Sequence, residues 1–233
     1  MTTPRSVKAW DWPTRAFHWA LVFCIVSAWA SIKFADKIGD ITIVWHRWNG
    51  FAIMVLVVFR LIWGIVGSST SRFSAFLTWP WTALRYAIDS IRTGSKPYLG
   101  HNPLGTWMII ILLASVMIQT SMGLFSVTET AAGPLKRLIE HETSEQITKW
   151  HARGIYVIAS LVVIHVSANV FYGLFKKEPL IRAMITGQKP AEIYADQQEL
   201  TVADHVTLRA MLCFLIAVVL VFGGIIGAGG KIL

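Results

Sequence analysis

The chain has 233 residues, of which 55% are apolar and only 15% charged, and its mean hydropathy is +0.56. Soluble domains carry about 25% charged residues, so this composition excludes an ordinary water-soluble protein. The net charge of +8 would suit nucleic acid, but no basic face with interleaved aromatic residues is found, so we expect no such partner. Cys24 and Cys213 each lie in an apolar run, which predicts packing rather than a disulfide or a thiolate metal site.

Five apolar segments are long enough to cross a bilayer, which takes roughly 20 residues. In chain order they cover residues 14–34, 45–66, 104–125, 150–174 and 208–228. The sequence therefore predicts an all-α fold, an integral membrane helical bundle with five transmembrane helices. We expect no cleavable signal peptide, because polar and aromatic residues from Trp10 to Arg15 interrupt the start of the chain.

The connection at residues 67–103 is long enough to hold a further helix. Its apolar residues recur at helical spacing, with charged residues between them, which predicts an amphipathic helix at the membrane surface. These apolar residues are Phe76, Ala83, Leu84, Ala87, Ile88 and Ile91. The connection at residues 126–149 mixes apolar and charged residues and is a candidate for a short helix on the opposite side.

The distribution of Lys and Arg predicts the orientation of the spans. Eleven lie in residues 1–15, 67–103 and 175–207, and six lie in residues 33–44, 126–149 and 229–233. This bias predicts a cytoplasmic N-terminus and an outer, periplasmic C-terminus. The positive charge of the chain is thus mainly a matter of membrane topology.

Four histidines lie within the predicted spans or at their ends: His18, His46, His151 and His165. His151 and His165 are 14 residues apart, which brings them to one face of a helix, separated by about 21 Å along its axis. One metal ion cannot use both, but two stacked cofactors can. His46 matches His151 in depth, and His18 matches His165, so the sequence predicts two bis-histidine haems.

Other interpretations of these histidines remain open. Each alone is more often a buried histidine bonded to a backbone carbonyl, although four at paired depths favour ligands. A zinc or copper site would need ligands that converge at one depth. A proton relay usually recruits carboxylates, and the cores of the spans contain no Asp or Glu.

Cations near these histidines are candidates to bind haem propionates. They are Arg15 near His18, Arg47 beside His46, and Lys149 and Arg153 on either side of His151. Arg60 lies 14 residues from His46 and hence on nearly the same face, where it would either meet a propionate of the inner haem or reach out to the interface. His101, in Gly-His-Asn-Pro, would contact a quinone head group or a propionate, or form a turn.

Several motifs carry a family resemblance. The stretch Val7–Trp19 (VKAWDWPTRAFHW) closely resembles the start of the prokaryotic cytochrome b561 family, which includes the b-type cytochrome subunit of nickel–iron hydrogenases. Also similar are Trp45–Gly50 (WHRWNG), Phe59–Gly64 (FRLIWG) with Gly67-Ser, Tyr98–Gly105 (YLGHNPLG) and the helix from Trp150-His to His165.

The resemblance implies a four-helix core with two b haems, whose ligands would be His18 and His165 for the inner haem and His46 and His151 for the outer. It covers roughly residues 7–190. We therefore divide the chain into a di-haem cytochrome b domain at residues 1–190, and a C-terminal cytoplasmic linker with the fifth transmembrane helix at residues 191–233. The fifth helix departs from the shortest members of the family and resembles the hydrogenase-type subunits.

The resemblance further implies electron transfer between the quinone pool and a periplasmic partner, in the bacterial inner membrane. The expected partners are lipid, quinone, and either a periplasmic redox protein, a hydrogenase-like subunit or a second copy of the chain. A second hypothesis is a stand-alone oxidoreductase that passes electrons from superoxide or another small molecule to quinone. A third is a haem-free transporter or an assembly anchor. The sequence leaves open whether the chain is itself an oxidoreductase or the cytochrome subunit of one.

Overall fold

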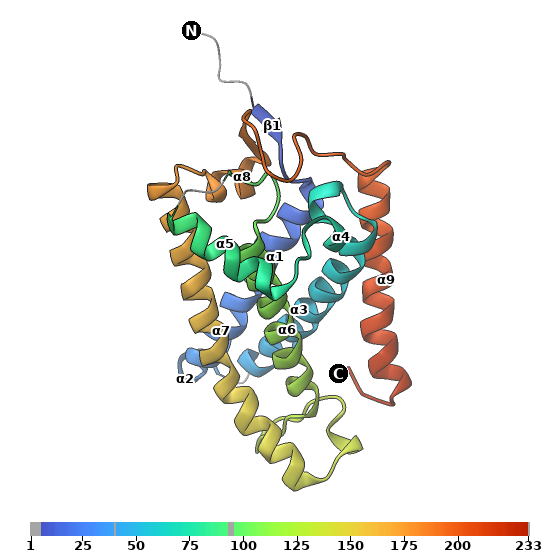
Figure 1. Ribbon diagram of the computed structural model, residues 1–233. Helices are drawn as coiled ribbons and strands as arrows, with labels where there is room; N and C mark the ends of the chain where they lie inside the picture. The colour runs from blue at the N-terminus through green and yellow to red at the C-terminus, as the bar shows by residue number, and fades with distance from the viewer. Residues whose placement is uncertain (1–5, 40, 93–95, 233) are drawn as a thin grey trace. The chain divides into compact units, whose positions relative to one another are not determined.

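The computed structural model describes residues 6–39, 41–92 and 96–232, and nearly all of their regular structure is helical (Figure 1). The long helices are α1 (Trp12–Lys33), α3 (Ile41–Val66), α6 (Pro103–Phe125), α7 (His141–Phe175) and α9 (Val206–Gly227). The short elements are β1 (Ser6–Lys8), α2 (Ala35–Ile38), η1 (Ser69–Ser71), α4 (Phe73–Phe76), α5 (Pro80–Arg92), η2 (Lys136–Leu138), α8 (Leu180–Thr186) and β2 (Gln188–Pro190).

All five long helices are apolar and long enough to cross a membrane. The predicted fold class, an all-α membrane bundle with five spans, is confirmed. Four of the helices begin within four residues of the expected positions, but α7 begins at His141, nine residues before the predicted start at residue 150. The polar residues of that first part gave no hydropathy signal. Cys24 in α1 and Cys213 in α9 form no disulfide.

The described residues fall into two compact units, and each unit takes one part of every long helix. Unit 1 comprises Met1–Ala16, Leu61–Leu112 and Leu161–Ala210. Unit 2 comprises Phe17–Arg60, Leu113–Ser160 and Met211–Leu233. His101 and His165 therefore belong to unit 1, whereas His18, His46 and His151 belong to unit 2.

Unit 1 contains a small cap that the sequence did not predict. Strand β1 pairs antiparallel with β2, so that Val7 lies opposite Lys189, and the two strands lie side by side in Figure 1. Behind them is a buried cluster that consists of Ala9, Trp10, Leu99, Ala183 and Tyr194. The carboxylate of Asp196 accepts hydrogen bonds from the backbone amides of Leu99 and Gly100. The segment after residue 190 is thus packed on the cap.

A buried turn, residues 68–71, connects three parts of unit 1. The hydroxyl of Thr70 donates to the carbonyl of Ala9 at 2.7 Å. The hydroxyls of Ser68 and Ser69 accept hydrogen bonds from the amides of Ala203 and Thr201. The turn therefore ties both the N-terminal segment and the segment before α9 to the end of α3.

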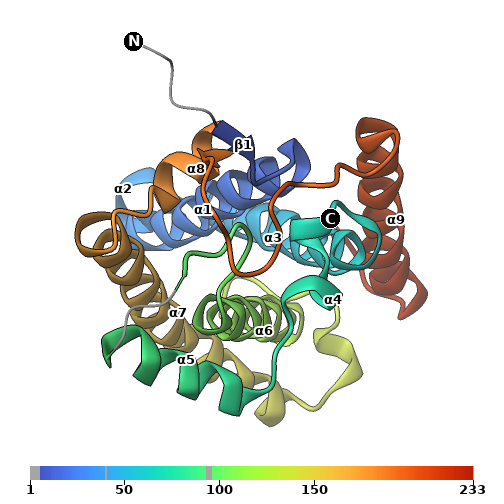
Figure 2. The same ribbon diagram turned by 45° about the horizontal axis from the view of Figure 1, so that its top comes forward.

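The surface helix expected within residues 67–103 is present as α5, while Phe76 belongs to the separate short helix α4. Figures 1 and 2 show α5 crossing the end of α7 rather than lying parallel to it. The two helices are joined by the Tyr86 and Tyr172 hydroxyls at 3.4 Å and by a hydrogen bond from the Lys176 ammonium to the Ser90 carbonyl. Trp79 and Trp81, at the start of α5, are 80% and 72% exposed, which suits a helix at a lipid interface.

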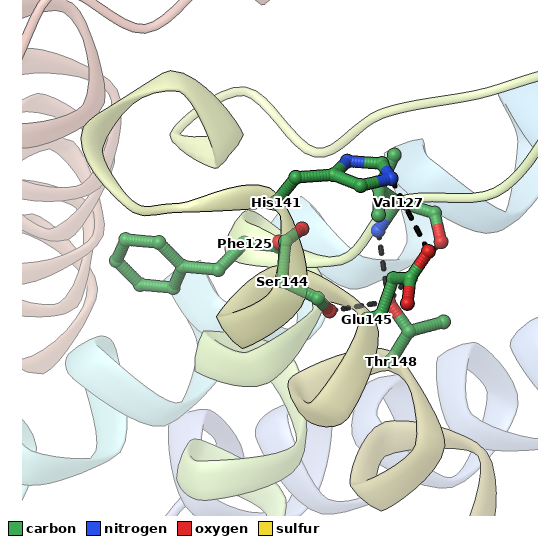
Figure 3. A network of polar contacts seen from close by, with 6 residues as sticks. All are labelled: Phe125, Val127, His141, Ser144, Glu145 and Thr148. Carbon is green, nitrogen blue, oxygen red and sulfur yellow. Dashed lines mark hydrogen bonds and ion pairs between the residues drawn. The ribbon is translucent and has the colours of Figure 1, made fainter.

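In unit 2, the connection from α6 to α7 is held in a defined shape by the first turns of α7 (Figure 3). The hydroxyl of Ser144 donates to the carbonyl of Phe125. The amide of Val127 donates to the hydroxyl of Thr148 at 2.8 Å. The expected short helix in this connection is the 3-10 turn η2. His141 is exposed and its Nε2 lies 3.2 Å from a carboxylate oxygen of Glu145.

The part of α9 in unit 2 packs on α3 through aromatic contacts, in which Phe222 meets both Trp48 and Phe51. Beside these rings is an open apolar groove of about 280 Å³. Its lining has no cation or carboxylate that would select a head group, and we assign no ligand to it. At the far end of α9, the guanidinium of Arg137 donates to the carbonyl of Ala228.

Candidate functional site

His46 of α3 and His151 of α7 lie beside each other in unit 2. Their ring centroids are 5.9 Å apart and their planes are nearly perpendicular, at 86°. A metal–imidazole bond is about 2 Å long and the ring centre lies about 1 Å further on, so two imidazoles on one ion have centres about 6 Å apart. The observed separation therefore matches two axial ligands of one iron.

The protonation of both rings follows from their hydrogen bonds. Nδ1 of His46 lies 3.0 Å from the carbonyl of Ala28, and Nδ1 of His151 lies 2.9 Å from the carbonyl of Gln119. Because a carbonyl oxygen only accepts, each Nδ1 carries the hydrogen and each Nε2 of the neutral ring keeps its lone pair. No described residue bonds to either Nε2. This arrangement is typical of histidines that ligate a metal through Nε2.

The surroundings of this pair also fit a flat macrocycle. Gly50 lies one turn after His46, and no atom lies within 4 Å of the position that a Cβ would take there. A Cβ at Gly123 would approach the His151 ring to 3.3 Å. Nε of Arg47 is buried and has no hydrogen-bond partner among the described residues. An open face and an unsatisfied cation are what a haem and its propionate would use.

The other two histidines belong to different units, His18 to unit 2 and His165 to unit 1. The ring of His18 lies edge-on to Trp19 with centroids 4.9 Å apart. The side-chain amide of Asn169, one turn after His165, donates to the His165 carbonyl at 2.7 Å and lies 3.3 Å from its Nε2. A metal at that Nε2 would replace the Asn169 contact, while the bond to the backbone carbonyl would remain.

The remaining predicted cations differ in their surroundings. Arg15 donates to the carbonyl of Ile185 at 2.6 Å, and its Nε is buried without a described hydrogen-bond partner. Lys149 and Arg153 are exposed, and the guanidinium of Arg153 lies over the ring of Trp150 at 6.0 Å. Of the cations beside the outer histidines, Arg47 is therefore the best placed for a buried anion.

Arg60 is only 3% exposed. Such low exposure does not suit a side chain that extends to the interface. The ring of His101 contacts the rings of Trp10 and Phe76, with centroids 4.6 and 4.7 Å away. The turn that this motif also predicted is formed by Asn102, whose side chain accepts a hydrogen bond from the amide of Gly105 and so caps α6.

The structure adds residues that the sequence did not single out. Gln119 and Asn169 both contact backbone groups of predicted histidine ligands, and such contacts leave no pattern in a sequence. The described residues contain no group of three or more His, Cys, Asp or Glu placed to hold a metal ion. A haem needs only two protein ligands, because its macrocycle supplies the others.

The chain is similar to one protein family and to several named proteins. A family model described as "Prokaryotic cytochrome b561" matches residues 9–187. The "Probable Ni/Fe-hydrogenase 1 B-type cytochrome subunit" of Escherichia coli (strain K12) is 24% identical over 209 residues, which are 76% of this chain and 88% of the relative. The "Probable Ni/Fe-hydrogenase B-type cytochrome subunit" of Cupriavidus necator is 26% identical over 220 residues, covering 79% and 88%. The protein of the same name in Bradyrhizobium diazoefficiens is 24% identical over 212 residues, which are 79% of this chain and 86% of the relative.

Proposed function

We propose that this chain, which belongs to the prokaryotic cytochrome b561 family, carries electrons between the quinone pool and a redox protein on the outer side of the membrane. The family and the five apolar helices make it a multi-pass membrane b-type cytochrome. The proposal specifies two b haems, each held between two histidines. Such a haem would supply a one-electron carrier, and two histidine ligands would leave no open position for oxygen.

The observation that carries the proposal is the pair of His46 and His151. Their separation of 5.9 Å, their Nδ1 hydrogen bonds to backbone carbonyls and the buried Nε of Arg47 together support an outer haem. The carbonyls hold both rings in the tautomer that a metal needs. Arg47 would then bind a propionate by a charge-assisted hydrogen bond.

The proposal for the inner haem rests on the sequence and on the family resemblance. His165 follows His151 by 14 residues on the unbroken helix α7, about 21 Å further along its axis. His18, near the start of α1, is its proposed partner. Two carriers at two depths would form a path across the bilayer, with Arg60 as the candidate for a propionate of the inner haem.

We place the quinone site on the cytoplasmic side, near His101. The rings of Trp10 and Phe76 that contact this imidazole offer the apolar, aromatic surroundings that a quinone ring would need. The excess of Lys and Arg in residues 1–15, 67–103 and 175–207 supports a cytoplasmic N-terminus in a bacterial inner membrane. The C-terminus would then lie in the periplasm.

The outer partner is proposed to be a hydrogenase-like subunit, because the relatives are named as B-type cytochrome subunits of Ni/Fe-hydrogenases. It would dock on residues 126–149, whose contacts with α7 (Figure 3) give the connection a defined shape. Purification in mild detergent tests this part. A stable complex with a second protein is expected, whereas a fully active isolated chain or a homodimer would contradict it.

A stand-alone reaction with a small anion such as superoxide has less support. It would use the cations of residues 126–149, yet the guanidinium of Arg137 already donates to the carbonyl of Ala228. The other cations of this segment, Lys136 and Lys149, are close in sequence to three carboxylates, those of Glu140, Glu142 and Glu145. An anion would therefore meet a mixed field rather than a positive patch.

A pyridine haemochrome assay on the purified protein, normalised to protein concentration, tests the cofactor. Two b haems per chain are expected. One haem would mean that one histidine pair is structural, and no haem would contradict the proposal altogether.

A further inference from the structure

Gln119 of α6 and His151 of α7 are joined by two hydrogen bonds that run in opposite directions. The ring Nδ1 of His151 donates to the carbonyl of Gln119 at 2.9 Å, and Nε2 of Gln119 donates to the carbonyl of His151 at 2.8 Å. Each residue uses one backbone and one side-chain group. Neither side chain can therefore turn without losing a bond to the other residue.

The ring of His46 is held differently, because its Nδ1 lies near both the carbonyl of Ala28 and, at 3.4 Å, the hydroxyl of Ser31. Its Nδ1 shares the carbonyl of Ala28 with the hydroxyl of Ser31, which donates to the same oxygen at 2.7 Å. No side chain returns a hydrogen bond to the backbone of His46 in the described part of the chain. The double contact with Gln119 thus distinguishes His151 from its neighbour.

Two glycines make the close approach of α6 and α7 possible. A Cβ at Gly154 would overlap Oε1 of Gln119, and a Cβ at Gly123 would press on the ring of His151. Glycine within a helix costs about 1 kcal/mol relative to alanine. Their presence at this contact indicates that the space is needed for the Gln119 amide and the His151 ring.

We propose that Gln119 is a positioning residue that fixes the plane of the His151 imidazole perpendicular to that of His46, and thereby tunes the outer haem. The inference rests on the proposed ligand role of these two histidines. A hydrogen bond from Nδ1 makes an imidazole a stronger donor to ferric iron. Loosening the contact should therefore raise the reduction potential of the outer haem.

The ring planes provide a readout that a merely structural residue would not move. When the two axial imidazoles of a low-spin ferric haem are perpendicular, two iron d orbitals are nearly equal in energy. The electron paramagnetic resonance signal is then strongly anisotropic, with a large maximum g value. Rotation of one ring toward the other lowers that value.

Two variants disturb the bond from the Gln119 amide to the His151 carbonyl, and both keep the backbone carbonyl of Gln119 that accepts from the ring. Gln119→Met keeps the length of the side chain but removes the amide. Gly154→Ala leaves both partners intact and fills the space of Oε1, while alanine favours the helix. Thr120→Val is the matched control, because it removes a buried hydroxyl of α6 that bonds to the carbonyls of Val116 and Met117 in the same helix.

Each purified holoprotein is assayed for haem content, for the ferric resonance signal and by redox titration. Both test variants should lower the maximum g value of one haem and raise its potential, whereas Thr120→Val should change neither. The double variant should show no larger change than the stronger single variant, because both act on one contact. Loss of one haem in both test variants but not in Thr120→Val would also support the proposal.

Unchanged spectra and potentials in both test variants, with two haems retained, would overturn the role of Gln119 and leave the two-haem proposal standing. A protein without substitutions that lacks the second haem would instead overturn the two-haem part of the proposed function. The haem content of the unsubstituted chain therefore separates the two failures.

Discussion

The carboxylate of Asp11 accepts a hydrogen bond from the indole nitrogen of Trp63 at 3.1 Å. It also accepts one from the amide of Thr14 at 2.9 Å and one from the hydroxyl of Ser71 at 3.3 Å. Asp11 immediately precedes α1, so the Thr14 amide is one of those that a helix start leaves unpaired. Asp11 is thus an N-cap that also joins α3 and η1 to the start of α1.

Replacing Asp11 with alanine should destabilise unit 1. The lost N-cap costs about 1 kcal/mol, and loss of the bond from the buried Trp63 indole costs about 1–3 kcal/mol, whereas Ser71 keeps its contact with the Thr14 hydroxyl. We expect a total loss of about 2–4 kcal/mol, seen as a lower melting temperature of the detergent-solubilised protein. Glu199→Ala, at an exposed position, is the control. Equal melting temperatures for the two variants would show that the Asp11 contacts contribute little.

His165→Ala should remove the inner haem and leave the outer one, so that the haemochrome content falls from two per chain to one. Asn169→Leu should retain both haems, because the Asn169 contact with Nε2 of His165 would already be replaced by iron. Two haems in His165→Ala would show that His165 is not a ligand.

Arg60→Gln should lower the potential of the inner haem more than that of the outer. Loss of a buried positive charge near a propionate favours the oxidised, more positive iron. Arg153→Gln is the control, since the Arg153 guanidinium is exposed and lies over Trp150. A redox titration in which Arg60→Gln moves both haems equally, or neither, would argue against a propionate contact.

Glu178 should make stability depend on pH. Burial raises the pKa of its carboxyl above the ordinary value of 4.5, although Lys189 nearby opposes the change. Burial likewise lowers the pKa of Lys189. The folded protein then holds the Glu178 proton more tightly than the unfolded chain does, so this contribution is complete below 4.5 and is lost as pH rises through the folded pKa.

The melting temperature of the unsubstituted protein should therefore fall as pH rises from 4.5, and Glu178→Gln should show a shallower fall. Glu142→Gln, at an exposed position in α7, should keep the original slope. If Glu178→Gln and Glu142→Gln give the same slope, the carboxyl of Glu178 is not protonated in the folded state over this range.

The five spans were predictable because apolar length alone identifies them. The approach of His46 to His151 was also predictable, since helical spacing fixed their depths. The β1–β2 cap was not, because its strands have three residues each, too few for a periodic pattern. The contact of Gln119 with His151 was not predictable for another reason. It uses backbone groups, which every residue possesses.

The hydrogen bond from Arg15 to the carbonyl of Ile185 is a third feature that the sequence did not predict. The sequence places Arg15 one turn from His18 and predicts a propionate contact, because only local spacing is visible in it. Its observed partner is 170 residues further along the chain. Every residue has a backbone carbonyl, so the sequence does not show which one accepts a hydrogen bond. Charged side chains near predicted ligands are therefore better assigned by their contacts than by their distance along the chain.

The pairing of β1 with β2 has a consequence for biogenesis. Ser6 lies opposite Pro190, so the first strand to leave the ribosome waits for its partner until four spans have been made. Until then its edge is open to other extended segments. A bulky domain inserted next to β1 would hinder this late pairing, whereas one inserted after α9 would not.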